Sequence, residues 1–406
     1  MATPFEHLQT TLKNGLAIYK APAMMAAIVR NHDFSVAAVR GVRKADVSAT
    51  DENNKVKAND RFCLGSVSKP VSGYLLAYLS QLNDNTIDWD IRIRDAFPEL
   101  ESAACRKHYN IRSSYLNANI AQMMSHSAGF PYAPKNSMDY AIDLAELKTT
   151  VNSDYQVEYC NHAALMQRRY NYMISSQQDA PVTGYVYNGG PILPAAMAER
   201  VMGKSFEQLL EQYLFQPLEM TTAGTGRTAT SGTPDGIWEH SWDATSKKFL
   251  PSEKRMHKTA SFHSHGPAGG IHFSADDAIK FIKALFINNK TKKLVQNAKL
   301  EEMYLTYMYD FSRYGWISTG TGNDLRVSHN GDNGTCRCQL TVWPNRGEGY
   351  IVCTNCNGND AAGDLTNCVN RNSNGNTIGA NIGCKTVDHV CDEIDNMLTN
   401  WTTMFS

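Results

Sequence analysis

Apolar positions near the N-terminus predict a helix followed by two strands. Leu8, Leu12 and Leu16 recur at the spacing of one helical face within the first 20 residues. Two short apolar runs follow at 26–30 and 35–42, and a polar Asn-His-Asp break separates them. A short polar break between two β-rich runs indicates a hairpin. We therefore expect the chain to enter a sheet directly after its first helix.

Helical patterns dominate the middle of the chain. A helix is predicted to begin at Gly65-Ser66, and Pro70 is compatible with it because the N–H groups of a first turn have no partner within the helix. The apolar positions that define this helix are Val71, Tyr74, Leu75, Tyr78 and Leu79. Further along, Gly203 is predicted to end one helix and Ser205 to begin the next.

Strand character returns near the C-terminus. Three β-rich runs at 326–331, 338–344 and 349–355 are separated by turn residues. An insertion rich in Asn, Gly and Cys follows at 357–384, and its composition predicts a loop. The chain is then predicted to close with a helix over residues 386–404.

Strands at both ends of the chain with helices between them favour an α+β fold, an α/β sandwich. We expect one antiparallel sheet that is built from both termini and flanked by helices, with an inserted and mostly helical domain. The expected α/β domain comprises 1–75 and 262–406, and the expected helical insert comprises 76–261. An active site is expected at the interface between the two.

Composition and charge narrow the classes of protein. Of the 406 residues, 42% are hydrophobic and 19% are charged, a balance that supports a well-buried core. The net charge of -1 leaves no basic surplus, so we expect no nucleic-acid partner. No apolar run reaches the roughly 20 residues that a membrane span requires.

The ten cysteines are unevenly distributed, and seven of them lie between 336 and 391. Such clustering is compatible with disulfides, a metal site or reduced thiols. Cys336-x-Cys338 and Cys353-x-x-Cys356 are the closest pairs, but they are expected on strands that face different ways. We therefore favour disulfides or free core thiols and predict no metal site.

The sequence says little about localisation. The N-terminal residues lack the basic and apolar regions of a signal peptide. Glycosylation sequons at Asn289, Asn333 and Asn400, together with the cysteine cluster, favour a secreted or extracytoplasmic location. A cytoplasmic location is the alternative.

The tetrapeptide Ser66-Val67-Ser68-Lys69 contains a candidate nucleophile and its base. Residues three apart lie on the same face of a helix, so the Ser66 hydroxyl and the Lys69 amine come within reach of each other. The amine must be neutral to accept a proton, and desolvation or a nearby cation lowers a lysine pKa. The Ser66 N–H at a helix N-terminus can stabilise an oxyanion. A capping serine beside a solvated lysine is the alternative interpretation.

Six blocks of the chain resemble, in order, the serine β-lactamase-related family. That family includes class C β-lactamases, D-Ala-D-Ala carboxypeptidases, D-amino-acid amidases and esterase and transesterase relatives, all with a penicillin-binding-protein-like fold. The blocks are 61–82, 86–100, 119–132, 203–220, 268–286 and 327–358. The resemblance covers roughly residues 24–358 and the last helix, and it implies that Ser66 is the nucleophile and Lys69 its partner.

The resemblance places the Lys/His-x-Gly motif of the family at His329-Asn330-Gly331. It implies that His329 and Asn330 contribute to substrate binding, and that His329 binds an acyl carboxylate or tunes Lys69. The glycine implies a close approach of the substrate to the strand. The N–H group of Asp332 is implied as the second oxyanion donor.

The Tyr-x-Asn motif of the family is altered in this chain. The matching stretch implies that Tyr187 acts as general base and then acid, with its pKa held low by the lysine charge, and Tyr185 is the alternative. Gly189 replaces the asparagine of the motif. Asn188 is expected to take over the binding of a substrate amide or carbonyl.

The resemblance implies acyl transfer through a Ser66 acyl-enzyme, with no metal or organic cofactor. The expected substrate is a small ester, or an amide such as a D-amino-acid peptide. A biosynthetic transesterase or acyltransferase is the alternative among enzymes. The missing asparagine keeps open a catalytically silent binding or sensor protein. The His-x-Gly form and the altered second motif argue against an efficient β-lactamase.

Overall fold

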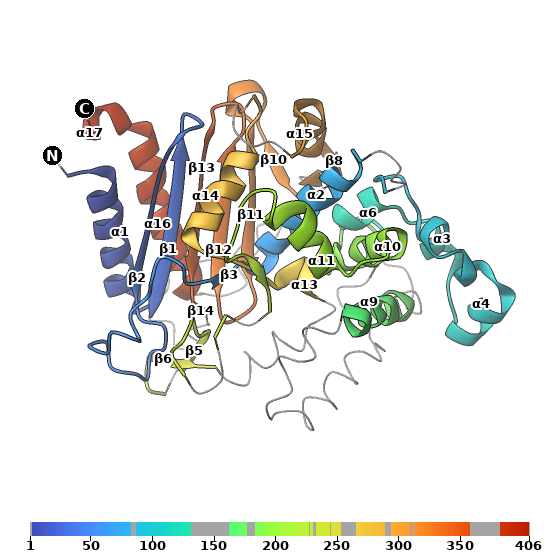
Figure 1. Cartoon of the computed structure of the whole chain (residues 1–406), viewed down its shortest axis with the longest axis horizontal. Coiled ribbons are helices and arrows are strands. Elements are labelled where there is room, and N and C mark those ends of the chain that lie inside the picture. Colours follow the sequence, from blue (N-terminus) through green and yellow to red (C-terminus); the bar gives the residue numbers. More distant parts are fainter. Residues whose placement is uncertain are drawn as a thin grey trace.

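A central sheet with helices on both faces organises the molecule (Figure 1). The computed structural model describes residues 2–82, 87–130, 162–176, 183–226, 228–229, 233–243, 245–252, 265–288, 294–308, 311–312, 314–357 and 382–405. Within these ranges no helix is both long enough and apolar enough to cross a membrane.

The sheet has eight strands in the order β2-β1-β13-β12-β11-β10-β9-β8. Its strands are β1 (Ala23–Arg30), β2 (Phe34–Gly41), β8 (Thr306–Met308), β9 (Phe311–Ser312), β10 (Ile317–Thr319), β11 (Arg326–Asp332), β12 (Arg337–Trp343) and β13 (Glu348–Thr354). All neighbouring strands are antiparallel. Because β1 pairs with β13, the expected sheet built from both termini is confirmed.

The helices begin and end where the sequence supplies caps. Gly203, with φ of +64°, ends α10, and Ser205 begins α11 through a capping box with Gln208, so the predicted boundary is confirmed. In chain order the helices are α1 (Pro4–Tyr19), η1 (Gly65–Val67), α2 (Ser68–Leu79), α3 (Ile93–Ala96), η2 (Pro98–Glu101), α4 (Ala103–Tyr109), α5 (Ser113–Leu116), α6 (Ile120–Met124), α9 (His162–Ser176), α10 (Ile192–Met202), α11 (Phe206–Leu210), η3 (Glu211–Phe215), α13 (Gly266–Gly269), α14 (Ala275–Ala284), α15 (Asn297–Tyr304), η4 (Gly322–Asp324), α16 (Ile382–Thr399) and α17 (Trp401–Phe405).

The strand β1 separates two apolar layers, because successive side chains of a strand point to opposite faces. Met24 and Ile28 pack with the buried leucines of α1 and the apolar face of α16. Met25 and Val29 belong to the larger layer, which includes α2 and α14. Figure 1 shows α1 and α16 side by side on one face and α14 on the other. Burial on both faces explains why β1 is an almost continuous apolar run.

The structure differs from the sequence-based expectation in two details. The helix that carries the candidate nucleophile opens with the 3-10 turn η1 before α2 begins. The predicted final helix is interrupted at Asn400, so α16 and α17 are separate. The Asn/Gly/Cys-rich insertion at 357–384 lies almost wholly outside the described residues.

Two small three-stranded sheets accompany the central one. Their orders are β14-β5-β6 and β3-β7-β4. Their strands are β3 (Phe62–Cys63), β4 (Gly224–Thr225), β5 (His240–Asp243), β6 (Lys248–Pro251), β7 (Ile271–Phe273) and β14 (Cys356–Asn357). Short strands therefore accompany the helices in the described part of 76–261, and the expected domain boundaries stay a prediction.

Candidate active site

The candidate nucleophile lies in a tight turn between β3 and α2. The Leu64 N–H donates to the Ile271 carbonyl at 2.9 Å and so anchors the turn to β7. Gly65 has φ of +51°, a left-handed conformation that glycine adopts readily. The turn leaves Ser66 partly exposed, whereas Lys69, one helical turn further on, is only 4% exposed. The hydroxyl is therefore open to a substrate while the amine is enclosed.

The Lys69 amine is held between two oxygen atoms. Its Nζ lies 3.0 Å from the Ser66 Oγ and 3.1 Å from the Ala268 carbonyl oxygen. Burial lowers the pKa of Lys69 to about 7, because a charged ammonium loses its hydration there. A neutral amine that donates to Ala268 keeps its lone pair for the Ser66 hydroxyl proton. The pair therefore has the geometry of a nucleophile and its base.

Tyr187 is the tyrosine that the structure brings to this pair. Its phenol interacts with the Ser66 side chain, and its ring centroid lies 4.6 Å from the Lys69 Nζ. Burial is the main cause that raises the pKa of Tyr187 to about 12. The expectation that the lysine charge holds this pKa low is therefore wrong. Tyr185 instead stacks on Phe311, with ring centroids 5.6 Å apart.

The end of β11 lies directly beside the nucleophile turn. A Cβ atom on Gly331 would lie 1.9 Å from the Leu64 carbonyl oxygen and 3.1 Å from the Ser66 backbone nitrogen. A Cβ atom on Gly65 would lie 2.8 Å from the Asp332 backbone nitrogen. Both positions require glycine because two backbone segments of the protein meet here. The expected reason for Gly331 was different, namely the close approach of a substrate to the strand. The Ser66 and Asp332 nitrogens are thereby held close to each other.

Side chains alternate along β11 between the site and solvent. His329 and Gly331 are buried, whereas Asn330 and Asp332 are exposed. The Asp332 carboxylate accepts hydrogen bonds from the Asn357 side chain at 2.6 Å and the Gly334 N–H at 2.7 Å. The strand therefore turns His329 inward and the Asn330 side chain outward.

The protonation of His329 follows from its contacts. Its Nδ1 lies 2.7 Å from the Asn330 carbonyl oxygen, which only accepts, so Nδ1 carries a proton. Burial, followed by the proximity of Lys69, lowers the pKa of His329 to about 3. In the neutral ring the Nε2 atom therefore has a lone pair and no proton. Nε2 is also buried with no hydrogen-bond partner among the described residues.

Asn188 has an internal role in the structure. Its side-chain Nδ2 donates to the Phe130 carbonyl at 3.3 Å. Its backbone N–H donates to the His126 Nδ1 at 3.3 Å. These bonds fix the loop that carries Tyr187. The expected binding of a substrate by Asn188 stays a prediction, and its amide is already engaged within the protein.

His126 and Phe311 complete the wall of the site and were not singled out from the sequence. The His126 ring centroid lies 4.5 Å from that of Tyr187 and 5.1 Å from that of Phe311. Burial, then the proximity of Lys69, lowers the pKa of His126 to about 3. His126 lies in the family-like block 119–132, which was the signal available for it. Phe311 lies in the two-residue strand β9, and the sequence offered no signal that this residue belongs to the site.

Comparisons with known proteins bear on the family and the fold of the chain. The family model described as Beta-lactamase matches residues 8–369. A beta-lactamase from a Sulfitobacter species has a similar structure with a TM-score of 0.63 and 13% identity, covering 97% of this chain and 100% of that chain. The D-amino acid amidase from Ochrobactrum anthropi matches with a TM-score of 0.62 and 16% identity, covering 96% and 98%. No curated protein matches the sequence.

A third solved structure extends the range of relatives. The octameric penicillin-binding protein homologue from Pyrococcus abyssi matches with a TM-score of 0.61 and 18% identity, covering 87% of this chain and 74% of that chain. At such identities the likeness establishes the fold alone. The expected penicillin-binding-protein-like fold, with its antiparallel sheet and flanking helices, is confirmed.

Proposed function

The chain belongs to the beta-lactamase family, and on that premise we propose that it is a serine acyl-hydrolase in which Ser66 forms the acyl-enzyme. The observation that carries this proposal is the contact of 3.0 Å between the Ser66 Oγ and the buried Lys69 Nζ. A lysine with a pKa near 7 is partly neutral at neutral pH and can act as a base. The family supports the reaction class, and this contact supports Ser66 as the nucleophile.

The two shifted pKa values support opposite proton roles for Lys69 and Tyr187 in the proposed mechanism. Neutral Lys69 takes the Ser66 proton as the oxygen attacks the scissile carbonyl, and the N–H groups of Ser66 and Asp332 stabilise the oxyanion. Tyr187 is protonated and gives its proton to the leaving alcohol or amine. Water then loses a proton to the phenolate and attacks the acyl-enzyme, while the Lys69 ammonium returns its proton to Ser66. Both groups are thereby regenerated.

His329 indicates which substrates fit the site. A neutral ring whose Nε2 only accepts a hydrogen bond offers nothing to a carboxylate, and it pairs with an N–H or O–H group instead. The implied role of His329 in binding an acyl carboxylate is therefore disfavoured. We propose that the substrate is an ester or amide whose acyl part carries a donor, such as the amino group of an aminoacyl compound.

Replacing His329 with Lys is expected to reverse this preference. The wild type should hydrolyse an aminoacyl ester at least about tenfold faster, in kcat/KM, than its N-succinyl analogue, because the carboxylate has no partner. His329→Lys supplies a cation and should shrink or invert this ratio. The N-acetyl ester, which has neither charge, is the matched control. An unchanged ratio in His329→Lys would exclude His329 as a determinant of specificity.

The pH profile is expected to rise through neutral pH. Lys69 must be neutral to accept the proton, and its pKa is lowered to about 7, so the active form increases as the pH rises from 6 to 8. Tyr187 loses its proton only near pH 12, so no decline from this group is expected up to about pH 9. Measuring kcat/KM for an uncharged ester tests this. A profile that falls from pH 6 to 8 would contradict the role of Lys69.

A panel of esters and amides tests the proposed function as a whole. We expect turnover of short-chain p-nitrophenyl esters, aminoacyl esters or D-amino-acid amides, with a burst of leaving group where deacylation is slow. An acyl-enzyme that forms but releases its acyl group only to an added alcohol or amine would identify an acyltransferase. No acylation by any member of the panel would favour a binding protein and overturn the proposal.

A further inference from the structure

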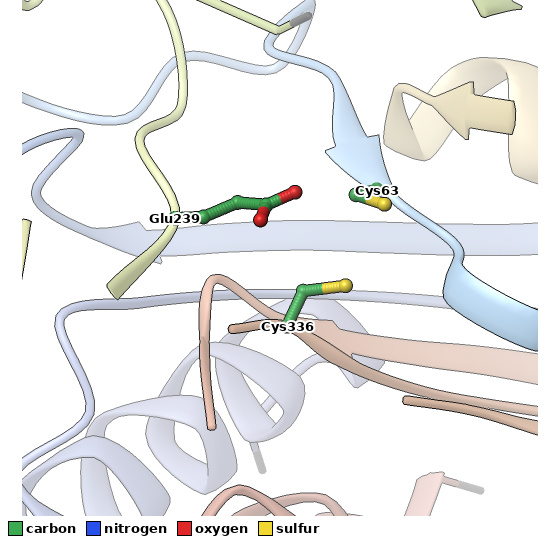
Figure 2. A group of neighbouring side chains, drawn as sticks. All are labelled: Cys63, Glu239 and Cys336. Atoms are coloured by element: carbon green, nitrogen blue, oxygen red, sulfur yellow. The ribbon is translucent and has the colours of Figure 1, made fainter. Parts of the chain in front are cut away.

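Three buried side chains outside the active site converge from separate parts of the chain (Figure 2). Cys63 lies on β3, Cys336 lies just before β12, and Glu239 lies just before β5. Their exposed fractions are 6%, 1% and 5%. One sulfur or oxygen atom from each lies within 4.8 Å of the others. We propose that these residues bind a divalent zinc-like ion through two thiolates and one carboxylate.

The donor set and its spacing fit such an ion. Zinc binds sulfur at about 2.3 Å and carboxylate oxygen at about 2.0–2.2 Å, so tetrahedral ligand atoms lie roughly 3.5–3.8 Å apart. A separation below 4.8 Å is close to this value and requires only small side-chain movements. Two sulfur ligands exclude calcium and magnesium, which prefer oxygen. The three residues leave a fourth position for water.

Asn333 holds the ligands in place from outside the site. Its Nδ2 donates to the Cys63 sulfur at 3.4 Å and to a Glu239 carboxylate oxygen at 3.2 Å. The Thr335 hydroxyl donates to the other oxygen of Glu239. The Asn333 Oδ1 accepts the Cys336 N–H at 2.8 Å. Outer hydrogen bonds of this kind orient metal ligands. They also engage the Asn333 side-chain amide, to which a sugar at this glycosylation sequon would have to be attached.

The position of the ion connects it to the reaction. Cys63 precedes the nucleophile by three residues, and Cys336 follows Asp332 by four. The ion would link the two segments that carry the proposed oxyanion donors and fix their separation. The Cys63 thiol donates to the Gly269 carbonyl at 3.7 Å. Both thiols would lose their protons when the ion binds, because the thiolate is the metal ligand. Binding should therefore strengthen as the pH rises.

A second thiol pair nearby provides the control. Cys338 and Cys353 are paired across β12 and β13, with their sulfur atoms 2.9 Å apart. The expectation that the two cysteine pairs face different ways is therefore wrong for these two residues, because they are directly opposed on neighbouring strands. No carboxylate joins them among the described groups that could hold a metal. This pair supplies two thiols without the third ligand.

Cobalt titration of the reduced, chelator-treated full chain tests the proposal. We expect one Co²⁺ per chain, a sulfur-to-cobalt charge-transfer band and displacement of Co²⁺ by Zn²⁺. Cys63→Ser or Cys336→Ser should lower the band by about half, since each removes one of two thiolates. Glu239→Gln should keep the band and weaken binding at least about tenfold. The double variant Cys338→Ser/Cys353→Ser should leave band and affinity unchanged.

Three results would overturn the metal site. They are the absence of a charge-transfer band, a band lost only in the Cys338/Cys353 double variant, and a Cys63–Cys336 disulfide in the protein purified with its thiols blocked. If a cysteine variant does not fold, the melting temperature of the wild type in the presence of each metal ion tests the site instead. It should rise with Zn²⁺ and stay unchanged with Mg²⁺. None of these readouts depends on ester or amide turnover.

Discussion

Ser66→Ala is expected to lower kcat for any substrate of the wild type by at least about 10³-fold. In the proposed mechanism the hydroxyl oxygen forms the acyl-enzyme, and none of the groups around it replaces it. Burial lowers the pKa of Lys69 to about 7, as a base requires, and Tyr187 is still protonated when the attack begins. The change removes one oxygen atom from a partly exposed side chain. The fold should therefore be retained, with a melting temperature within a few degrees of the wild type.

Ser80→Ala is the matched control for this variant. Ser80 caps the far end of α2, and its hydroxyl bonds only to the Ala77 carbonyl within the described residues. Its loss should leave kcat unchanged. Ser68 is a poorer control, because its hydroxyl accepts the Ile271 N–H at 3.0 Å inside the core. Equal turnover in Ser66→Ala and Ser80→Ala would show that another residue is the nucleophile.

Lys69→Met is expected to lower kcat by about 10²- to 10⁴-fold without lowering stability. The methionine fills a similar volume but cannot accept the Ser66 proton. Burial lowers the pKa of Lys69 to about 7, which means that the folded state disfavours its charge while the unfolded state does not. Removing the amine therefore removes this free-energy penalty on the folded state at pH values below about 10. The melting temperature should therefore stay equal or rise by a few degrees.

Lys13→Met separates this effect from a general effect of lysine loss. Lys13 is exposed on α1, on the face of the sheet away from α2, and its replacement should change neither kcat nor the melting temperature. A Lys69→Met protein that retains wild-type turnover would remove Lys69 from the mechanism. A protein that loses activity together with its fold would instead assign Lys69 a structural role.

The fold could be predicted because its determinants are local or periodic. The apolar spacing of Leu8 and Leu12 predicts α1, and the caps at Gly203 and Ser205 predict where α10 ends and α11 begins. These signals act over one or two helical turns. The strand runs at both ends of the chain then predicted one sheet built from both termini, whereas the order of its strands was not predicted, because no local pattern determines it.

The site was predictable only in part. The spacing of Ser66 and Lys69 follows from one helical turn, so their contact could be anticipated. The contact of Tyr187 with Ser66 depends on a loop more than one hundred residues away, and a sequence cannot show its burial. The predicted direction of the Tyr187 pKa shift was therefore wrong, since burial raises this pKa. The protonation of His329 depends likewise on the Asn330 carbonyl, a backbone atom that every residue has.

The cysteines illustrate the same limit. Sequence spacing groups Cys336 with Cys338, but Cys336 lies just before β12 and Cys338 lies within it, and the two residues have different partners. Cys338 meets Cys353 through strand pairing, whereas Cys336 meets Cys63 and Glu239 from distant segments. Spacing along the chain identifies a metal site only when the ligands are close in sequence.

Mass spectrometry of the acylated protein tests the central claim most directly. The wild type is incubated with a slowly released acyl ester, quenched in acid, weighed intact and then digested. We expect one acyl group per chain, bound to the peptide that contains Ser66, and no adduct in Ser66→Ala. An adduct on any other residue, or turnover by a protein that never becomes acylated at Ser66, would contradict the proposed mechanism.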